Sequence, residues 1–147
     1  MRIIAGEFRG RALAAVGKCD AGAHLRPTTD RVRESLFNVL MHTGAIDGAR
    51  VLDLFAGTGA LGLEALSRGA ALVTFVDDGR VAQGLIRKNV GICRAEDRTA
   101  LIRRSALKLG QNPDAPYDVI FLDPPYGKDL GQKALAVADA GGWIAPG

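Results

Sequence analysis

The sequence has 147 residues, 48% of them hydrophobic and 24% charged, a composition typical of one compact globular domain. Cys19 and Cys93 form no CxxC motif, and His24 and His42 have no partners at zinc-ligand spacing, so neither a disulfide scaffold nor a metal site is expected. A net charge of +3 permits a polyanionic partner without requiring one. No apolar run suits a signal peptide or a transmembrane helix, so a cytoplasmic location is expected.

Residues 1–48 are expected to form an extension of a single domain whose core spans 49–147. Residues 2–5 and 11–14 predict a small β-hairpin across Gly6 and Gly10. A helix is expected after Pro27, with Thr28, Thr29 or Asp30 as its cap. Its predicted apolar face consists of four residues: Val32, Leu36, Val39 and Leu40.

From residue 51 onward, short apolar runs alternate with helical patterns. Buried strands are expected at Val51–Leu54, Leu72–Val76, Thr99–Ile102 and Val119–Leu122. Helices are expected at Ala60–Ser67 and Val81–Val90. This alternation predicts an α/β fold with a Rossmann-like, doubly wound parallel sheet and a ligand site at the carboxyl ends of its strands.

The first of these strands runs into Gly57, Gly59 and Gly62, which match G-x-G-x-x-G, and Asp77 ends the second strand. This arrangement indicates a nucleotide-type ligand, and a plain glycine-rich turn is the alternative. Asp53 would repel a pyrophosphate but suits an ammonium group, which favours S-adenosylmethionine over a dinucleotide. Asp77 would then accept the two ribose hydroxyls.

The fourth strand is followed by Asp123-Pro124-Pro125-Tyr126. Two prolines hold the chain extended and supply no N–H, so this element offers a carboxylate and a carbonyl as acceptors. Such acceptors suit an exocyclic amino group, whose lone pair they would aim at a methyl donor while Tyr126 stacks on the base. The structural alternative is a proline-rich turn in which Asp123 serves as a cap.

Four stretches together resemble a known family: residues 2–11, LRPTTDRVRESLFN at 25–38, VLDLFAGTGALGLEALSRGA at 51–70 and FLDPPY at 121–126. The sequence resembles the class I S-adenosylmethionine-dependent methyltransferases that modify the exocyclic N2 of a guanine in bacterial 16S ribosomal RNA. The run at 25–38 is the most particular of the four. The family's sheet continues beyond the point where this sequence ends, at 142–147, so its C-terminal strands are expected to be missing here.

The resemblance implies roles for individual residues. Asp123, Pro124 and Tyr126 would hold the guanine. A second set would bind the cofactor: Asp53, Phe55, Ala56, Gly57, Thr58, Gly59, Asp77, Ser105 and Ala106. Ser105 stands where the family pattern has an acidic or amide residue for the adenine amino group, and its hydroxyl can still accept one hydrogen bond.

The segment with Arg26, Thr28, Asp30 and Arg31 would lie over the pocket. The plainer interpretation is that Thr28 and Asp30 cap a helix and that Arg31 pairs with Glu34.

Basic residues suggest where RNA would bind, with 16S rRNA or the assembling 30S subunit as the partner. Arg2, Arg9 and Arg11 of the hairpin are the better candidates, whereas the charged run from Arg87 to Lys108 suits a solvated face. Three other functions stay open: amino methylation of adenine, dinucleotide binding, and RNA binding without catalysis. An unpaired outer edge at Val119–Leu122 also predicts self-association.

Overall fold

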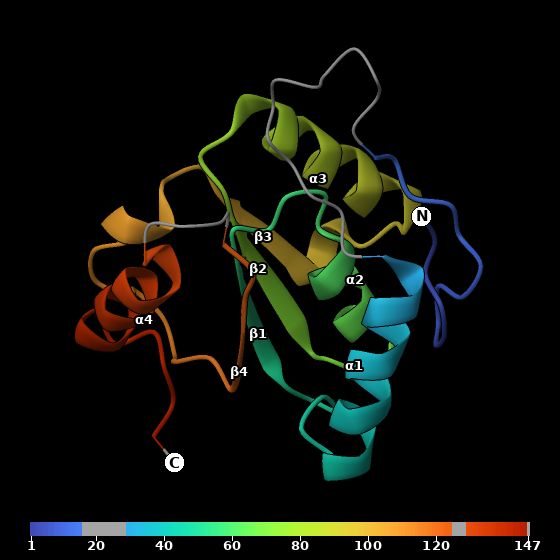
Figure 1. Cartoon of the computed structure of the whole chain (residues 1–147), viewed down its shortest axis with the longest axis horizontal. Helices are drawn as coiled ribbons and strands as arrows, with labels where there is room; N and C mark the ends of the chain where they lie inside the picture. The colour runs from blue at the N-terminus through green and yellow to red at the C-terminus, as the bar shows by residue number, and fades with distance from the viewer. Residues whose placement is uncertain (16–28, 125–128, 147) are drawn as a thin grey trace.

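A computed structural model describes residues 1–15, 29–124 and 129–146, and it contains one parallel sheet of four strands (Figure 1). The strands are β1 (Arg50–Leu54), β2 (Leu72–Val76), β3 (Thr99–Ile102) and β4 (Val119–Leu122), in the spatial order β3-β2-β1-β4. The order therefore reverses at β1, which lies between β2 and β4. This arrangement confirms the predicted doubly wound α/β fold.

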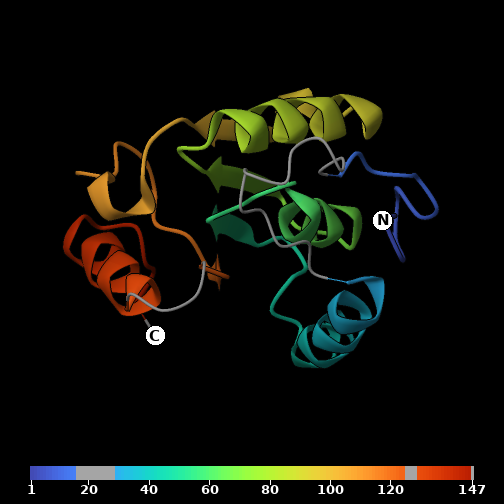
Figure 2. The same cartoon turned by 45° about the horizontal axis from the view of Figure 1, so that its top comes forward.

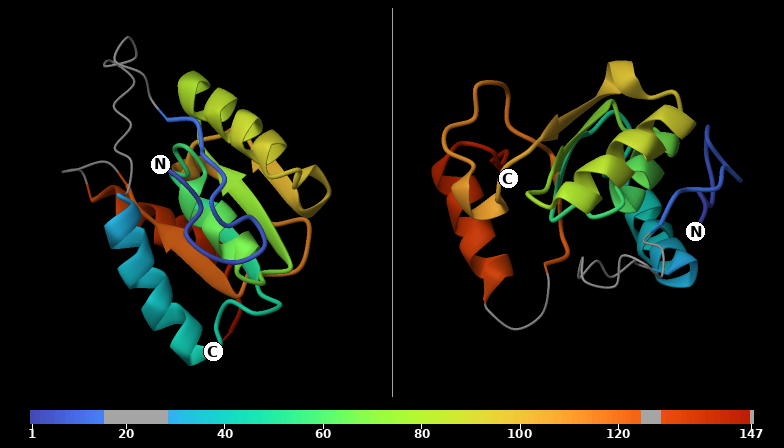
Figure 3. Two further views of the ribbon diagram at one scale, coloured as in Figure 1. Left: turned by 90° about the vertical axis from the view of Figure 1, so that its right-hand side faces the viewer. Right: turned by 90° about the horizontal axis from the view of Figure 1, so that it is seen from above.

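Helices cover both faces of the sheet, as the view from above in Figure 3 shows. One face carries α1 (Asp30–Thr43), α2 (Ala60–Ser67) and α3 (Arg80–Ile92). The other carries α4 (Leu130–Ala140) and the short 3-10 helix η3 (Ala106–Lys108), and a second 3-10 turn, η2 (Glu96–Arg98), precedes β3. Val51 faces the first side and Leu52 the second, as the alternation of side chains along a strand requires.

The four strands and the helices α2 and α3 lie within two residues of their predicted bounds. The expectation that all four strands are buried is wrong for the sheet edges. β1 and β2 are buried over four of their five residues, whereas only Phe121 is buried in β4 and no residue of β3 is. An edge strand has a neighbour on one side only, and its apolar composition does not reveal this position.

The outer edge of β4 has a partner just before the strand begins. Tyr117 forms a parallel bridge with Ile144: its N–H donates to the Trp143 carbonyl at 2.8 Å, and its carbonyl accepts from Ala145 at 3.0 Å. The last described residues thus occupy the start of a fifth strand position. Self-association through the remaining edge at Val119–Leu122 stays a prediction.

The apolar face predicted for α1 is wrong at three of its four positions, since of these residues Leu40 alone packs against the core, where it is half-buried. Val32 and Val39 are 58% and 64% exposed, and Leu36 is exposed as well, while Arg33 and Phe37 are fully buried. Phe37 contacts Phe121 of β4, and Arg33 contacts Glu64 of α2. The hydrophobic pattern failed because the position facing the core holds an arginine whose charge is neutralised by a residue 31 positions away.

Residues 1–15, here called the N-terminal arm, form the expected hairpin-like pairing. Arg2 and Ala12 make an antiparallel bridge, and Ile3 donates to the Arg11 carbonyl at 3.0 Å. The arm lies across α2 on the side away from the sheet (Figure 3), which explains why seven of the eight residues of α2 are buried. Ile3, Phe8 and Leu13 of the arm join the core on this face. The expected boundary between extension and core at residue 48 stays an interpretation.

Candidate active site

The topology brings three predicted carboxylates to one edge of the sheet, here called the carboxylate edge: Asp53, Asp77 and Asp123. Leu54 is in register with Val76 of β2 and with Leu122 of β4, so Asp77 and Asp123 both lie one residue beyond this level. Asp53 lies one residue before it, inside β1. In Figure 2 the arrowheads of β1 and β2 point to the same side of the molecule. This edge lies at the switch point of the strand order, where α/β sheets bind their ligands.

Between β1 and α2 the chain follows a tight path through the glycine loop, residues 55–59. Phe55, Gly57 and Gly59 have φ angles of +55°, +62° and +82°. This conformation is sterically unfavourable for Phe55 but not for glycine. Ala56 donates to the Val76 carbonyl at 3.1 Å and accepts from Gly59 at 2.9 Å. A non-glycine residue held in this conformation indicates that its surroundings impose it, as is common at ligand sites.

The third glycine of the motif serves helix packing. A Cβ atom on Gly62 would lie 2.5 Å from the Phe75 ring and 2.7 Å from a Val73 methyl carbon. Only glycine therefore lets α2 approach β2 so closely. The close approach also brings the Gly62 N–H to Oδ2 of Asp53, at 3.1 Å.

Asp53 is only 2% exposed. Burial raises the pKa of this carboxyl well above its usual value, the Gly62 N–H opposes the rise, and the negative charges of Asp77 and Asp123 add to it. In the described part of the chain, neither Asp53 nor Asp77 forms an ion pair. A cationic group placed beside Asp53 would therefore meet an uncompensated acid.

Asp77 ties the glycine loop to the turn after β2. Its Oδ2 accepts from Gly57 at 3.0 Å and its Oδ1 from Gly79 at 2.8 Å. Burial raises the pKa of this half-buried carboxyl, and the two N–H groups partly offset the rise. Each carboxylate oxygen keeps a further lone pair, so Asp77 can also accept hydroxyl protons from a ligand.

Asp123 directly follows β4 and is exposed, and Pro124 after it is half-buried. The negative charge of Asp123 adds to the rise in the pKa of Asp53, and along β4 it lies two residues beyond Phe121, which is in register with Asp53. Tyr126 lies outside the described residues, as does Pro125. The stacking predicted for Tyr126 therefore stays a prediction.

Ser105 and Ala106 follow β3 at the same end of the sheet. The Ser105 hydroxyl accepts from Leu107 at 3.1 Å and so caps η3, while Ala106 is buried against the face that carries α4. The hydroxyl can form a further hydrogen bond, so the predicted contact with an adenine remains compatible with the geometry.

The residues predicted to cover the pocket or bind RNA have several different surroundings. Arg26 and Thr28 lie outside the described residues, and the N-cap of α1 is Thr29, whose hydroxyl accepts from Val32 at 3.2 Å. The predicted pair Arg31–Glu34 does not form among the described residues, and the ion pair in this turn joins Asp30 to Arg33 at 3.0 Å. Arg31 is exposed.

Two arginines of the arm line a cleft of about 450 Å³, between the arm and the start of α1. Arg2 and Arg9 contribute to it together with Arg68, Asp30 and Glu34. This cleft lies on the far side of α2 from the sheet and is separate from the carboxylate edge.

Arg11 has a structural role instead. Its guanidinium lies 5.1 Å from the Phe8 ring centre and donates to the Ile92 carbonyl, while Arg98 approaches the same ring at 5.4 Å. These contacts hold the arm against the end of α3. A substitution of Arg11 would therefore disturb the arm as well as its charge.

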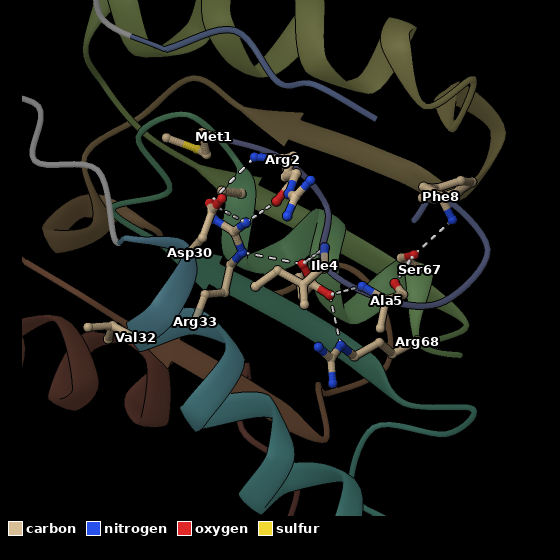
Figure 4. A network of polar contacts seen from close by, with 12 residues as sticks. Met1, Arg2, Ile4, Ala5, Phe8, Asp30, Val32, Arg33, Ser67 and Arg68 are labelled. Carbon is tan, nitrogen blue, oxygen red and sulfur yellow. Dashed lines mark hydrogen bonds and ion pairs between the residues drawn. The ribbon is translucent and has the colours of Figure 1, made fainter. Parts of the chain in front are cut away.

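Sequence reasoning missed a polar network, here called the arm junction: Asp30, Arg33, Glu64, Arg68 and the main chain of the arm. Figure 4 shows Asp30, Arg33 and Arg68 of this network beside the arm. Glu64 and Arg33 are fully buried and paired at 3.3 Å, and Arg68 pairs with the same carboxylate at 2.8 Å. Glu64 also accepts the N–H groups of Ile4 and Ala5, at 2.9 and 3.2 Å. The available signal was a single acid inside the otherwise apolar helix ALGLEALS.

The carboxylate edge matches the chemistry of S-adenosylmethionine. Asp53 offers a buried acid for an ammonium group, Asp77 offers acceptors for ribose hydroxyls, and a Cβ on Gly57 would meet nothing nearer than a carbonyl 4.0 Å away. The loop therefore leaves room for close approach of a ligand.

Within residues 1–15, 29–124 and 129–146, no group of three or more His, Cys, Asp or Glu side chains could hold a metal ion. In that same part of the chain, no helix has the length and apolar character needed to cross a membrane.

Comparisons with known proteins agree with this geometry. A family model described as Conserved hypothetical protein 95 matches residues 1–147. Ribosomal RNA small subunit methyltransferase D of Escherichia coli is 39% identical over 145 residues, which are 99% of this chain and 70% of the relative.

Two solved structures extend the comparison. The first is the Escherichia coli protein yhhF, a candidate methyltransferase, whose structure matches this one with a TM-score of 0.83 at 39% identity. The match covers 99% of this chain and 75% of the yhhF chain. The N2 methyltransferase of 16S rRNA from Thermus thermophilus, solved with S-adenosylmethionine and guanosine, has a TM-score of 0.65 at 26% identity, with coverage of 82% and 33%.

Proposed function

The chain belongs to the family described as Conserved hypothetical protein 95, and from this premise we propose that it methylates the exocyclic N2 amino group of a guanine in 16S ribosomal RNA, with S-adenosylmethionine as the donor. The observation that carries the proposal is the convergence of Asp53, Asp77 and Asp123 at one edge of the sheet. Asp53 and Asp77 suit the ammonium group and the ribose of the cofactor. Asp123 would accept the amino group of the guanine.

The cofactor supplies an electrophilic methyl group on a sulfonium when it is bound. Asp53 would hold its ammonium group, and Asp77 would hold its ribose while it keeps the glycine loop folded through the Gly57 N–H. The glycines allow the loop main chain to approach the ligand. Ser105 is available for the adenine as a hydrogen-bond partner.

Asp123 and Pro124 would orient the guanine. A carboxylate and a carbonyl can accept both N–H bonds of an amino group, which localises the nitrogen lone pair and aims it at the methyl carbon. As the N–C bond forms and the S–C bond breaks, the nitrogen must lose one proton. Asp123 is exposed, so this proton has a path to water.

The RNA itself would make contacts beyond the pocket. Arg2 and Arg9 are exposed on the arm and line the same cleft, and guanidinium groups bind phosphates readily. The name of the relative at 39% identity supports the small ribosomal subunit as the source of this RNA. The guanosine in the Thermus thermophilus complex supports guanine as the base.

Incubation with S-adenosylmethionine labelled in its methyl group tests the proposal. Naked 16S RNA and 30S particles from a strain that lacks this activity are compared as substrates, and the labelled nucleosides are then identified. We expect N2-methylguanosine. Labelled N6-methyladenosine would move the function to the adenine class, and NADH binding without any S-adenosylmethionine binding would favour a dinucleotide module. Binding of the cofactor and of RNA without any label transfer would indicate a non-catalytic protein.

A further inference from the structure

Asn89 of α3 is a fully buried amide that the proposed chemistry does not use. Its Oδ1 accepts from the Ala14 N–H at 2.6 Å, and its Nδ2 donates to the carbonyls of Ala14 at 3.0 Å and of Thr58 at 2.8 Å. Both amide hydrogens and the oxygen thus have partners. These partners belong to two segments far apart in the sequence, the N-terminal arm and the glycine loop.

The contact with Thr58 fixes one peptide group of the glycine loop at both ends. The Thr58 carbonyl accepts from Asn89, and the N–H of the same peptide group, from Gly59, donates to Ala56 at 2.9 Å. This peptide lies between the two glycines with positive φ angles. Glycines have the most conformational freedom to lose, so a loop that contains two of them keeps one path only where hydrogen bonds hold it, and Asn89 supplies one of these bonds.

The arm makes further contacts with the same loop and with the helix that follows it. The Thr58 hydroxyl lies 3.7 Å from the Met1 sulfur. At the other end of α2, Ser67 accepts from Phe8 through its hydroxyl, at 2.9 Å, and from Glu7 through its carbonyl, at 2.8 Å. The arm is therefore attached at both ends of the unit formed by the glycine loop and α2, and Asn89 makes the attachment at the ligand end.

We propose that Asn89 is a positioning residue that joins the arm to the glycine loop, so that docking of the arm and binding of the cofactor stabilise each other. The inference rests on the proposed function only in taking the glycine loop as the cofactor site. If the docked arm holds the loop in its binding geometry, a ligand that binds this geometry must hold the arm more firmly in return, because such coupling is reciprocal.

The test compares two asparagines with the same bonding pattern. Asn112 also donates to two carbonyls, those of Ala115 and Gly142, and accepts one N–H, from Asp114, but it lies beside the C-terminal residues of the described chain. Asn89→Asp and Asn112→Asp each keep the acceptor and remove the donors. S-adenosylhomocysteine is the probe: its dissociation constant is measured by calorimetry, and exchange of the arm amides is measured with and without it.

We expect Asn89→Asp to weaken S-adenosylhomocysteine binding about tenfold at pH 7.5, the loss typical of one or two buried hydrogen bonds, and Asn112→Asp to leave it within twofold. The loss of affinity in Asn89→Asp relative to the parent should become smaller as the pH falls, because a protonated carboxyl at position 89 regains one hydrogen-bond donor. In the parent, the ligand should slow exchange at Ile3, Leu13 and Ala14, and Asn89→Asp should lose this protection.

Three results would overturn the inference: unchanged affinity in Asn89→Asp, an equal loss in Asn112→Asp, or arm exchange in the parent that the ligand does not alter. The last measurement needs no variant, so it decides the question even if Asn89→Asp does not fold. Failure of the proposed function has a different signature. In that case S-adenosylhomocysteine protects the arm but no N2-methylguanosine forms.

Discussion

The arm junction and the carboxylate edge both bury acids, yet their charges are balanced in opposite ways. At the arm junction, the Glu64 carboxylate accepts from two guanidinium groups and two main-chain N–H groups. At the carboxylate edge, the Asp53 carboxylate accepts a hydrogen bond from Gly62 and from no other described residue, and the charges that act on it are the acids Asp77 and Asp123. The charges of the junction are thus neutralised within the chain, where Arg33 Nη1 is the one buried side-chain donor without a hydrogen-bond partner among the described residues. The acid at the edge becomes balanced only when a cationic ligand arrives.

This difference separates stability from function. A buried charge with its partners in place holds distant segments together, and removal of one partner leaves the other charge stranded. A buried acid without an opposite charge is costly to the fold but is prepared to bind a cation.

The largest effect is expected when the arm junction loses its central acid. Glu64→Gln leaves the fully buried Arg33 with the half-exposed Asp30 as its remaining acidic partner, so the free energy of unfolding should fall by about 3 kcal/mol. Urea denaturation measures this loss. Glu7→Gln is the control because Glu7 pairs with Arg98 at the surface, where such pairs contribute at most about 1 kcal/mol. If Glu64→Gln and Glu7→Gln lose the same free energy of unfolding, the arm junction stabilises the fold no more than the surface ion pair does.

At the carboxylate edge, loss of Asp123 should affect turnover and little else. Asp123→Ala is expected to lower kcat about 100-fold or more while the dissociation constant of S-adenosylhomocysteine changes less than twofold, because the proposed partner of Asp123 is the base. Asp78→Ala, at an exposed acid directly after Asp77, is the matched control. A parallel loss of cofactor affinity in Asp123→Ala would make Asp123 a structural or cofactor residue.

The pH dependence of stability should reveal the cost of the unbalanced acid. Because the folded state raises the pKa of Asp53, it holds a proton that the unfolded chain releases, and stability falls as the pH rises from about 4 toward the folded pKa. Asp53→Asn keeps an acceptor for Gly62 but does not titrate. Its melting temperature relative to the parent should therefore increase between pH 4.5 and pH 7.5, while its affinity for S-adenosylhomocysteine falls. A constant difference across this range would contradict the role of burial at Asp53.

The smallest effect is expected at the exposed arginines of the arm. Arg2→Glu with Arg9→Glu should weaken RNA binding about three- to tenfold at low salt and reduce the dependence of binding on salt, since each lost phosphate contact lowers that slope by about one. Arg11 is left intact because it holds Phe8. Lys133→Glu, on α4 at the opposite face, serves as the control. RNA affinity that falls equally in both variants would assign the effect to net charge.

The sequence alone determined the elements of the sheet and the residues of the glycine loop. The four strands and helix α2 were predicted within a residue because apolar runs, glycines and caps act over a few neighbouring positions. The glycine motif identified Asp53 and Asp77 as candidates, and the Asp-Pro-Pro-Tyr element identified Asp123, before their arrangement was known. The roles of Arg26, Thr28 and Tyr126 remain predictions, as these residues lie outside the described part of the chain.

Only the tertiary structure decided which of these residues lie together and which polar groups are buried. The order β3-β2-β1-β4 brings Asp123 beside Asp53, 70 positions earlier in the chain. The buried face of α1 contains Arg33 because Glu64 neutralises it, and Asn89 is buried because its partners are Ala14 and Thr58. Local patterns count apolar residues, whereas the burial of a charge or an amide depends on a partner that the chain supplies from far away.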